Sequence, residues 1–571
     1  MFAKYYASEL AFLRERGPEL AAGPLRPLMR QLLSRGGDPD VERLVESFAF
    51  LTARLRERID HGAPEVIDAL AEMVAPHLQR TIPATSIVEF SPNIQALRGP
   101  QVIPRGRTVE AYSPSGALCR FQSCYEVELL PIEIVDVVAS AAGAGAQTLT
   151  IRLRVTAIGR ALLAQPRALR FFIAAEPALA STLRFLVLTR CRGVEVRVLG
   201  SDGVVVARSE RSAATICAVG LDEPLIPWPE LAPQGLRLLH ELIAAPDKAM
   251  FFELAGPLIG DARGELVELC LHLDGDLALP GEVSSTTLRL HCSPVVNLFE
   301  ATAEPILADA LRAEHLLRVS GERPGHAEIY AITAVKGSRG GRPADRVYRP
   351  FYGDGQADPG PSDYYSLRRA RSPIDGGVDT YLTLGPSVAE GEVIHVDALA
   401  HNRLHAAELG QGAIAREPRS GALRLRNITP VTPPVPTPLD GALSWRLLAH
   451  LSLGHVGLAD AGNLRRLLSV HDYQAGTPRS IAVKIAGIRG VTTAHVTRVV
   501  DGAPLRGLQT TVRVEESAFL GIGEAQLFLT AIARIFADRL GFNTFHELVA
   551  RLVPSEIELR WPALTGMLAP L

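Results

Sequence analysis

The spacing of apolar residues changes near Pro83, and this change limits which folds the chain can adopt. Before Pro83, apolar residues recur every three or four positions between Val41 and Ile59, which is typical of one face of a helix. After it, segments such as SIVEF (86–90) and TLTIRLRV (148–155) alternate every two residues, as strands with one buried face do. The pattern predicts an α+β protein with helices first and a β-rich centre.

The N-terminal region is predicted to be a helical hairpin. Pro39 suits the first position of a helix, and the apolar stripe that follows includes Phe48, Leu51 and Leu55. We expect this stripe to be buried against another helix, from this chain or from a partner. A second helix is expected between Val66 and Leu78.

The predicted centre contains one clear hairpin and one helix. In VEVRVLGSDGVVVARS (194–209) two alternating runs flank turn residues, and in EPALASTLRFLV (176–187) the leucines share one helical face. TTLRL (286–290) is a further predicted strand. Glycine and proline are too frequent between 337 and 377 for continuous regular structure, so a long loop is expected there. Five prolines within 430–438 predict a semi-rigid linker.

The C-terminal part is predicted to be a small α/β domain. Helices are expected at 442–453 and 463–470, strands at 481–488 and 508–514, and a last apolar helix at 523–540. The complete division has four regions: N-terminal helical (1–84), β-rich central (85–336), loop-rich and β with the proline linker (337–439), and C-terminal α/β (440–571).

Composition argues against several classes of protein. The 571 residues are 47% hydrophobic and 21% charged, as in ordinary folded proteins, and a net charge of −3 provides no field for nucleic acid or an anionic membrane. The N-terminus lacks the apolar core of a signal peptide, and no window reaches about 18 apolar residues, so we expect neither export nor direct membrane insertion. Without a CxxC pair, the six cysteines predict reduced thiols in a cytoplasmic protein.

Short motifs for metal or phosphate binding are weak. His401 and His405 in HNRLH could face one side of a helix, but the glutamate of a HExxH zinc motif is missing, so satisfied or surface histidines are the favoured interpretation. GIGEAQ (521–526) lacks the third glycine and the Lys-Ser/Thr of phosphate loops, and a turn before a core helix explains it. No cofactor, metal or catalytic residue is predicted.

The predicted loop at 337–377 interleaves arginines with aromatic residues, among them Arg346, Arg349, Phe351 and Tyr352. Such a mixture can bind single-stranded nucleic acid by charge and stacking. It also suits a contact between proteins, where arginine and tyrosine are enriched. Because aspartates offset most of the positive charge, we favour the protein contact.

The stretch HCSPVVNLFE (291–300) contains the residue types of several hydrolases. Adjacent residues on a strand point to opposite faces, so His291 and Cys292 would diverge, and proline at 294 is not expected in a central strand. The favoured interpretation is a structural seam: a turn followed by an apolar plug of Val295, Val296, Leu298 and Phe299.

Four long segments resemble one protein family in the same order along the chain. They are YYASELAFLRERGPELA (5–21), DPDVERLVESFAFLTARLRERID (38–60), CSPVVNLFEATAEPI (292–306) and GEAQLFLTAIARIFADRLGFNTFHEL (523–548). The chain resembles the TssF family, also called ImpG or VasA, which are baseplate subunits of bacterial type VI secretion systems.

The resemblance implies a structural component of the baseplate wedge rather than an enzyme. It implies assembly with TssG-, TssK- and TssE-like subunits and a further TssF copy, in the cytoplasm and held at the inner membrane through partners. An enzyme with an unrecognised Cys/His or metal site is the alternative. The candidate partner-contact residues are Tyr5, Tyr6, Leu10, Phe48, Leu51, Leu55, Val295, Asn297, Leu298, Phe299, Arg346, Arg349, Phe351 and Tyr352.

Overall fold

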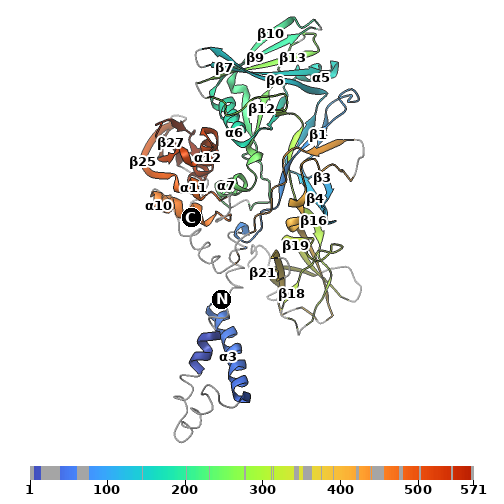
Figure 1. The fold of residues 1–571 in the computed structure, drawn as a ribbon, viewed down its shortest axis with the longest axis vertical. Helices are drawn as coiled ribbons and strands as arrows, with labels where there is room; N and C mark the ends of the chain where they lie inside the picture. Colours follow the sequence, from blue (N-terminus) through green and yellow to red (C-terminus); the bar gives the residue numbers. More distant parts are fainter. Residues whose placement is uncertain are drawn as a thin grey trace.

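A computed structural model shows a mixed α+β chain in which strands predominate and form several sheets (Figure 1). This confirms the predicted class and the strand-rich composition. The structure describes residues 6–13, 39–60, 72, 76–143, 146–200, 202–229, 232–260, 262–275, 278–309, 312, 314–339, 346–351, 363–373, 376–386, 388–389, 391–418, 423–436, 439, 455–458, 460–474, 480–500, 503–541 and 544–566.

Strands from three distant parts of the sequence form a first five-stranded sheet. In spatial order they are β24 (Arg424–Asn427), β1 (Thr85–Ser91), β15 (Cys292–Val296), β4 (Leu118–Ser123) and β3 (Thr108–Tyr112). Most of β1 is buried, because Val88 and Phe90 face one apolar core and Ile87 faces another. The short strands β2 (Gln101–Ile103) and β5 (Val127–Leu129) form a separate pair.

Two further antiparallel sheets and six helical elements form the centre of the chain. One sheet is β10 (Val205–Ser212), β9 (Cys191–Leu199), β13 (Leu266–Asp274), β7 (Ala146–Val155) and β6 (Ile132–Gly143). The other is β11 (Ile216–Val219), β12 (Phe251–Ala255), β8 (Ala168–Ile173) and β14 (Leu288–Arg289). The helical elements are α5 (Ala157–Leu163), α6 (Pro177–Phe185), the π-helical η3 (Leu186–Arg190), η4 (Ala213–Thr215), α7 (Gln234–Ala244) and η5 (Pro246–Ala249).

A larger sheet follows β15 directly along the chain. Its strands are β16 (Phe299–Thr302), β23 (Val393–His401), β19 (Glu328–Ser338), β20 (Arg346–Pro350), β21 (Tyr364–Arg371), β22 (Val378–Leu384) and β18 (His315–Leu316), with β17 (Ile306–Leu307) also on β23. Only β20 and β21 pair in parallel among these described strands. The 3-10 helix η6 (Arg403–Glu408) follows β23.

The C-terminal unit is built around one long helix and a sheet. It contains α9 (His455–Leu458), α10 (Ala461–Val470), α11 (Ala482–Ala486), β25 (Ile488–Val500), β26 (Ala503–Glu515), η7 (Glu516–Ala518), α12 (Ile522–Ala537), β27 (Phe545–Val553), β28 (Glu558–Arg560) and β29 (Leu564–Thr565). β26 and β27 are parallel, so α12 forms the crossover between them. In Figure 1 the unit lies beside α6 and α7.

α3 (Pro39–Asp60) lies at the end of the molecule away from β10, and residues 6–13 form a short helical segment (Figure 1). The 3-10 helix η2 (Pro76–Leu78) precedes β1. Most of the predicted helix between Val66 and Leu78 lies outside the described residues, as does the predicted helix at 442–453.

Three larger apolar cores are present among the described residues. The central core extends from the central sheets into α10 and α12, the first-sheet core lies under β1 and β4, and the eight-strand core lies in the sheet that contains β19 and β23. The central core thus joins the C-terminal unit to the rest of the chain. The four-region division remains a prediction.

Several predicted elements are confirmed and others are wrong. The hairpin β9–β10, helices α6, α10 and α12, and strands β1, β7 and β26 lie where the pattern placed them. The segment 481–488 is mostly helix α11 rather than a strand, because its apolar residues Ile481 and Ile485 also fit one helical face. The 337–377 segment is not continuous loop, because it contains β20 and β21.

The expectation that Pro294 would lie outside a central strand is also wrong. Pro294 lies within β15, between β1 and β4, and is opposite Ile87. Registered pairing with β4 covers only Val295 and Val296, so the missing N–H of Pro294 interrupts no pair on that side. Its carbonyl accepts a hydrogen bond from the Cys124 N–H at 2.8 Å, just past the end of β4.

Candidate functional site

The polar side chains that open HCSPVVNLFE all bond to backbone groups. The His291 ring accepts the Leu130 N–H through Nε2 at 3.0 Å, and the Cys292 thiol donates to the carbonyl two residues before it at 3.2 Å. The Ser293 hydroxyl accepts the Tyr125 N–H at 3.0 Å. His291 and Ser293 thus connect this segment to the chain around β5, while Cys292 bonds within its own segment.

Burial also opposes a Cys-His nucleophile at this position. It lowers the pKa of His291 to about 4 and raises the pKa of Cys292 well above its usual range. A cysteine nucleophile needs a thiolate, and a basic imidazole commonly activates it. Here the imidazole is kept neutral and the thiol protonated, which is the reverse arrangement.

The rest of the stretch connects three cores. Val295 lies in the first-sheet core, Leu298 in the central core and Phe299 in the eight-strand core. All three side chains are buried, and the Arg120 guanidinium lies over the Phe299 ring at 5.2 Å. The segment is therefore a seam within this chain, and a direct partner contact by these residues remains an untested prediction.

Asn297 fixes the crossover between the two sheets. Its side-chain NH₂ donates to the Asn402 side-chain oxygen at 2.8 Å and to the Arg120 carbonyl at 2.7 Å. In return, its own side-chain oxygen accepts the Asn402 N–H at 2.8 Å. Both asparagines are fully buried, so this reciprocal pair satisfies polar groups that would otherwise be costly to bury.

His401 and His405 each contact a carboxylate. His401 ends β23 and lies 3.2 Å from the Glu328 carboxylate in a buried site. His405 lies in η6, where Nδ1 is 3.0 Å from Glu408 and 2.7 Å from the Ser115 hydroxyl. Because serine and glutamate share the same ring nitrogen, the trio cannot relay a proton as a catalytic triad does. The satisfied-histidine interpretation agrees with this geometry.

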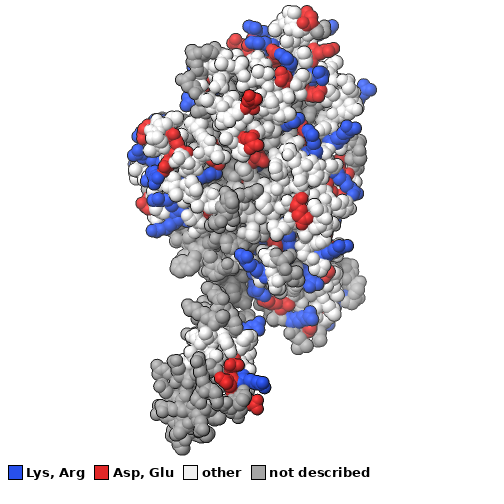
Figure 2. Space-filling view, in the orientation of Figure 1, with Lys and Arg blue, Asp and Glu red and all other residues white. Residues whose placement is uncertain are grey.

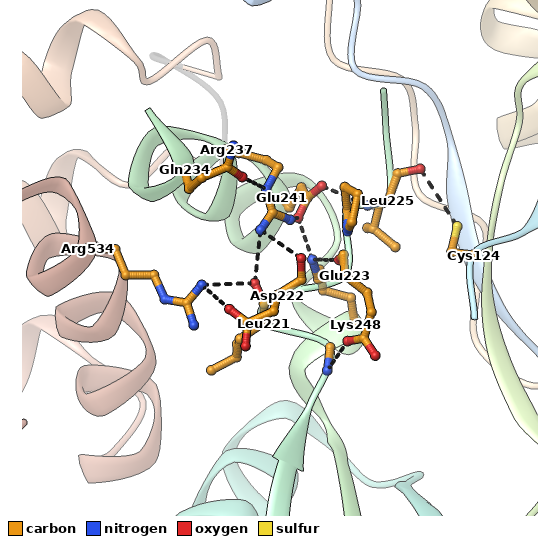
Figure 3. Close-up of polar contacts among 12 residues, drawn as sticks. Cys124, Leu221, Asp222, Glu223, Leu225, Gln234, Arg237, Glu241, Lys248 and Arg534 are labelled. Carbon is orange, nitrogen blue, oxygen red and sulfur yellow. Dashed lines mark hydrogen bonds and ion pairs between the residues drawn. The ribbon is translucent and has the colours of Figure 1, made fainter. Parts of the chain in front are cut away.

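A buried ion network in the central region was not indicated by the sequence (Figure 3). The Glu241 carboxylate accepts from Arg237 at 2.9 Å and from Lys248, and also accepts the Leu225 N–H at 2.8 Å. Arg237, Glu241 and Lys248 are each at most 2% exposed. Lys248 also donates to the Glu223 carbonyl at 2.9 Å. The network therefore holds the loop before α7 against α7 and η5.

The same loop binds the C-terminal unit. Arg534 of α12 forms an ion pair with Asp222 at 2.6 Å, as Figure 3 shows, and Asp538 accepts the Gly235 N–H at 2.5 Å. A Cβ at Gly235 would lie 2.3 Å from the backbone of Ile535, and one at Gly523 would lie 2.0 Å from the Ser181 carbonyl. These two glycines let α12 approach α7 and α6 at backbone distance. We call this contact the α12 seam.

An aromatic cluster lies beside the α12 seam. His77 stacks on Trp228 at 4.5 Å, and His240 Nε2 lies 2.9 Å from His471 Nδ1. Tyr473 packs edge-on against His240 at 4.8 Å. The residues come from η2, from the loop before α7, from α7 and from the segment after α10, so the cluster connects three distant parts of the chain.

The predicted apolar stripe of α3 faces outward. Leu44, Phe48 and Leu51 are 70%, 58% and 64% exposed, although their spacing puts them on one face. Among the α3 side chains that the structure describes, the buried ones are the small Ala49 and Ala53. Burial of Phe48 and Leu51 within this chain is thus not found, and the partner alternative remains a prediction.

Other N-terminal candidates are placed only in part. Tyr6 and Leu10 are half-buried in the helical segment 6–13. Tyr5 and the side chain of Leu55 lie outside what the structure describes.

The arginine- and tyrosine-rich segment has an inner and an outer side. Arg346 is half-buried and pairs with Asp363 and with Glu392, the latter at 3.4 Å, so it is an internal anchor. Arg349 and Phe351 are exposed on or next to β20. Tyr352 lies outside the described residues.

Charged side chains of both signs are interspersed over the face seen in Figure 2, with no large area of one sign. Within the described residues, no helix is long and apolar enough to cross a membrane.

Comparison with known proteins extends over almost the entire chain. Residues 1–567 match the family described as "Type VI secretion system, TssF". The type VI secretion system component TssF1 of Pseudomonas aeruginosa is 28% identical, and the match covers 99% of this chain and 98% of that protein.

Two solved structures are similar in fold. A chain of the type VI secretion system TssK-TssF-TssG baseplate subcomplex matches with a TM-score of 0.75 and 27% identity, over 92% of this chain and 100% of that chain. A chain of the baseplate complex from the type VI secretion system matches over 100% of both chains with a TM-score of 0.64. At its 24% identity, the second likeness concerns the fold.

Proposed function

Because this chain belongs to the TssF family of type VI secretion system baseplate components, we propose that it is a non-enzymatic wedge subunit that binds several other subunits. Its partners are TssG- and TssK-like subunits, a TssE-like subunit and a second copy of this chain. The wedge lies in the cytoplasm and is held at the inner membrane through these partners.

The observation that carries this proposal is the outward apolar stripe of α3. Leu44, Phe48 and Leu51 lie on one face of a 22-residue helix and are all more than half exposed. Monomeric proteins rarely leave such a stripe open, whereas helical grooves in assemblies bind through anchors at this spacing. A helix of a partner subunit is therefore the expected cover for α3.

The outer side of β20 is the second proposed contact. Val347 and Phe351 are 56% and 48% exposed, and the exposed Arg349 lies between them. The Phe351 ring also contacts Tyr364 at 4.6 Å. An arginine set among aromatic and apolar side chains is typical of contacts between proteins.

Purification of the full-length tagged chain from its native cell tests the proposed function. We expect TssG- and TssK-like subunits to co-purify, together with untagged copies of this chain. A folded chain that purifies with none of these subunits would contradict the proposal.

Two arginines of β20 provide a matched pair of variants for the second contact. Arg349→Glu should reduce partner recovery without lowering the melting temperature, because Arg349 is exposed. Arg346→Glu should lower the melting temperature, since it places a third carboxylate beside Asp363 and Glu392. Equal partner recovery for Arg349→Glu and the unmodified chain would remove β20 from the interface.

A further inference from the structure

The C-terminal sheet ends in a long edge strand that is open on one side within the described residues. β25 is 13 residues long, and the only strand paired with it in the described part of the chain is β26. Of the other long edges, β10 carries three charged residues, and β6 carries Glu133, Asp136 and two register shifts. Charges and irregularities of this kind protect natural edge strands from pairing.

The middle of β25 lacks these protections. Residues 491–497, VTTAHVT, include no Lys, Arg, Asp, Glu or Pro. The one register shift of β25 lies at its start, between Ile488 and Gly490, and the ladder is regular from there to Val500. The edge is therefore long, regularly paired and free of strong charge over seven consecutive residues.

The far end of β25 extends past the rest of its sheet. β27 joins β26 from Gly507 onward, so the pairs from Thr497–Arg506 outward are held by two strands alone. Thr492 and Ala494 are exposed on one face of the strand, and His495 and Thr497 are exposed on the other. A two-stranded ribbon in water is marginally stable, and a third strand stabilises it.

We propose that β25 pairs in an antiparallel manner with β25 of a second copy of this chain. Recognition of an unrelated peptide strand needs pockets for its alternate side chains, whereas the small polar side chains around the middle of β25 offer pairing by backbone. A strand that pairs with its own copy about a two-fold axis provides the same donors and acceptors on both sides. The result is one continuous sheet made from two five-stranded sheets.

We take the register whose two-fold axis passes through His495, which the charges and threonines of β25 allow. A two-fold axis at His495 places Thr493 opposite Thr497 and Thr492 opposite Arg498, so no two arginines face each other. Pairs of threonines across strands are favourable, and like charges directly opposite are unfavourable. Arg498 is further neutralised within its own chain by its ion pair with Glu547.

The register predicts a charge-swap experiment on the full-length chain. His495→Lys and His495→Glu each place two like charges directly opposite one another and should weaken self-association roughly tenfold or more. Co-expression of the two variants with different tags should restore the pair, because lysine then faces glutamate. His395→Lys is the matched control, since His395 is exposed on β23, which is paired on both sides.

The inference rests on the second copy named in the proposed function, and separate measurements distinguish the two. Light scattering and two-tag co-purification report self-association, while recovery of TssG- and TssK-like subunits reports the proposed function. Unchanged self-association in both single variants, no restoration on mixing, or a wild-type chain that does not self-associate would each overturn the β25 pairing.

A cross-link locates the contact independently. His495→Cys, made with Cys217→Ser to remove the exposed native thiol, should form a disulfide-linked dimer on mild oxidation. Residues directly opposite in antiparallel strands have Cβ atoms about 4.5–5.5 Å apart, close to the separation that a disulfide needs. A cross-link of equal yield from His395→Cys would overturn the assignment.

Discussion

Helices α12 and α3 carry similar apolar stripes but use them differently. In α12, Leu529, Ile532 and Phe536 are completely buried in the central core, and Gly523 allows backbone contact with α6. In α3, Leu44 and Phe48 stay more than half exposed, and the buried residues among its described side chains are alanines. The difference shows that an amphipathic pattern predicts a buried face without saying which molecule covers it.

The largest loss of stability is expected from removing the Glu241 carboxylate of α7, the helix that packs against α12. Glu241→Ala leaves Arg237 and Lys248 buried without their shared carboxylate, which typically destabilises by about 3–5 kcal/mol. Urea unfolding measures the loss. Glu558→Ala, at a solvent-accessible carboxylate paired with Arg551 and Arg560, is the control and should lower stability far less. Equal unfolding curves for the two variants would show that the buried network is unimportant.

The seam at HCSPVVNLFE provides the next largest effect. Phe299→Ala removes a buried ring from the eight-strand core and should cost about 3–5 kcal/mol. Cys292→Ala removes one sulfur and should cost far less, about 1 kcal/mol. Thermal melts of both variants, with a secretion assay, check this order. If Cys292→Ala folds and assembles normally yet stops secretion, while Phe299→Ala is silent, the structural interpretation is wrong.

Acid should weaken the same seam without affecting α3. Burial lowers the pKa of His291 from 6.5 to about 4, so the folded state binds fewer protons than the unfolded state. The associated stability is fully present above pH 6.5 and is lost as the pH falls towards 4, by about 3 kcal/mol in total. His291→Asn keeps an acceptor that tolerates the positive φ of 57° but does not titrate. If the unmodified chain and the His291→Asn variant lose the same free energy of unfolding between pH 7 and 4, His291 is not the group that makes the seam sensitive to acid.

The smallest effect on stability is expected at α3. Phe48→Ala should change the free energy of unfolding by no more than about 0.5 kcal/mol, because Phe48 is exposed in this chain. Its effect should appear as lower recovery of a partner subunit in co-purification. A loss of stability above about 2 kcal/mol would instead place Phe48 in an internal core and remove the contrast with α12.

The sequence predicted elements well where one period was unambiguous. The β9–β10 hairpin and α12 have long, regular patterns, and both are confirmed. Segment 481–488 is short and apolar, and such a segment fits a helix or a strand, so α11 was mistaken for a strand. β20 and β21 were missed because their glycine- and proline-rich flanks hide strands that are stabilised by pairing with distant partners.

In the candidate site, too, the sequence did not reveal features that depend on distant parts of the chain. The seam was predictable, but strand geometry does not describe His291, which precedes β15 and has a φ of 57°. The Arg237–Glu241 pair was not recognised, because charges four residues apart on a helix are usually exposed. Its burial depends on the loop at 221–225 and on Lys248, which the spacing of α7 alone does not reveal.

The strands of the first sheet are made at widely separated times during synthesis of the chain. β1 pairs with β15 and β24, and the side-chain contact between Thr85 and Thr432 spans 347 positions. At about 5–20 residues per second, a ribosome needs tens of seconds to make that interval. Until β24 leaves the ribosome, one edge of β1 has no partner strand. Before β15 has been made, neither edge of β1 is paired. A nascent chain stalled before Arg424 therefore presents an open apolar strand, which makes truncated products of this subunit natural targets for chaperones and proteases.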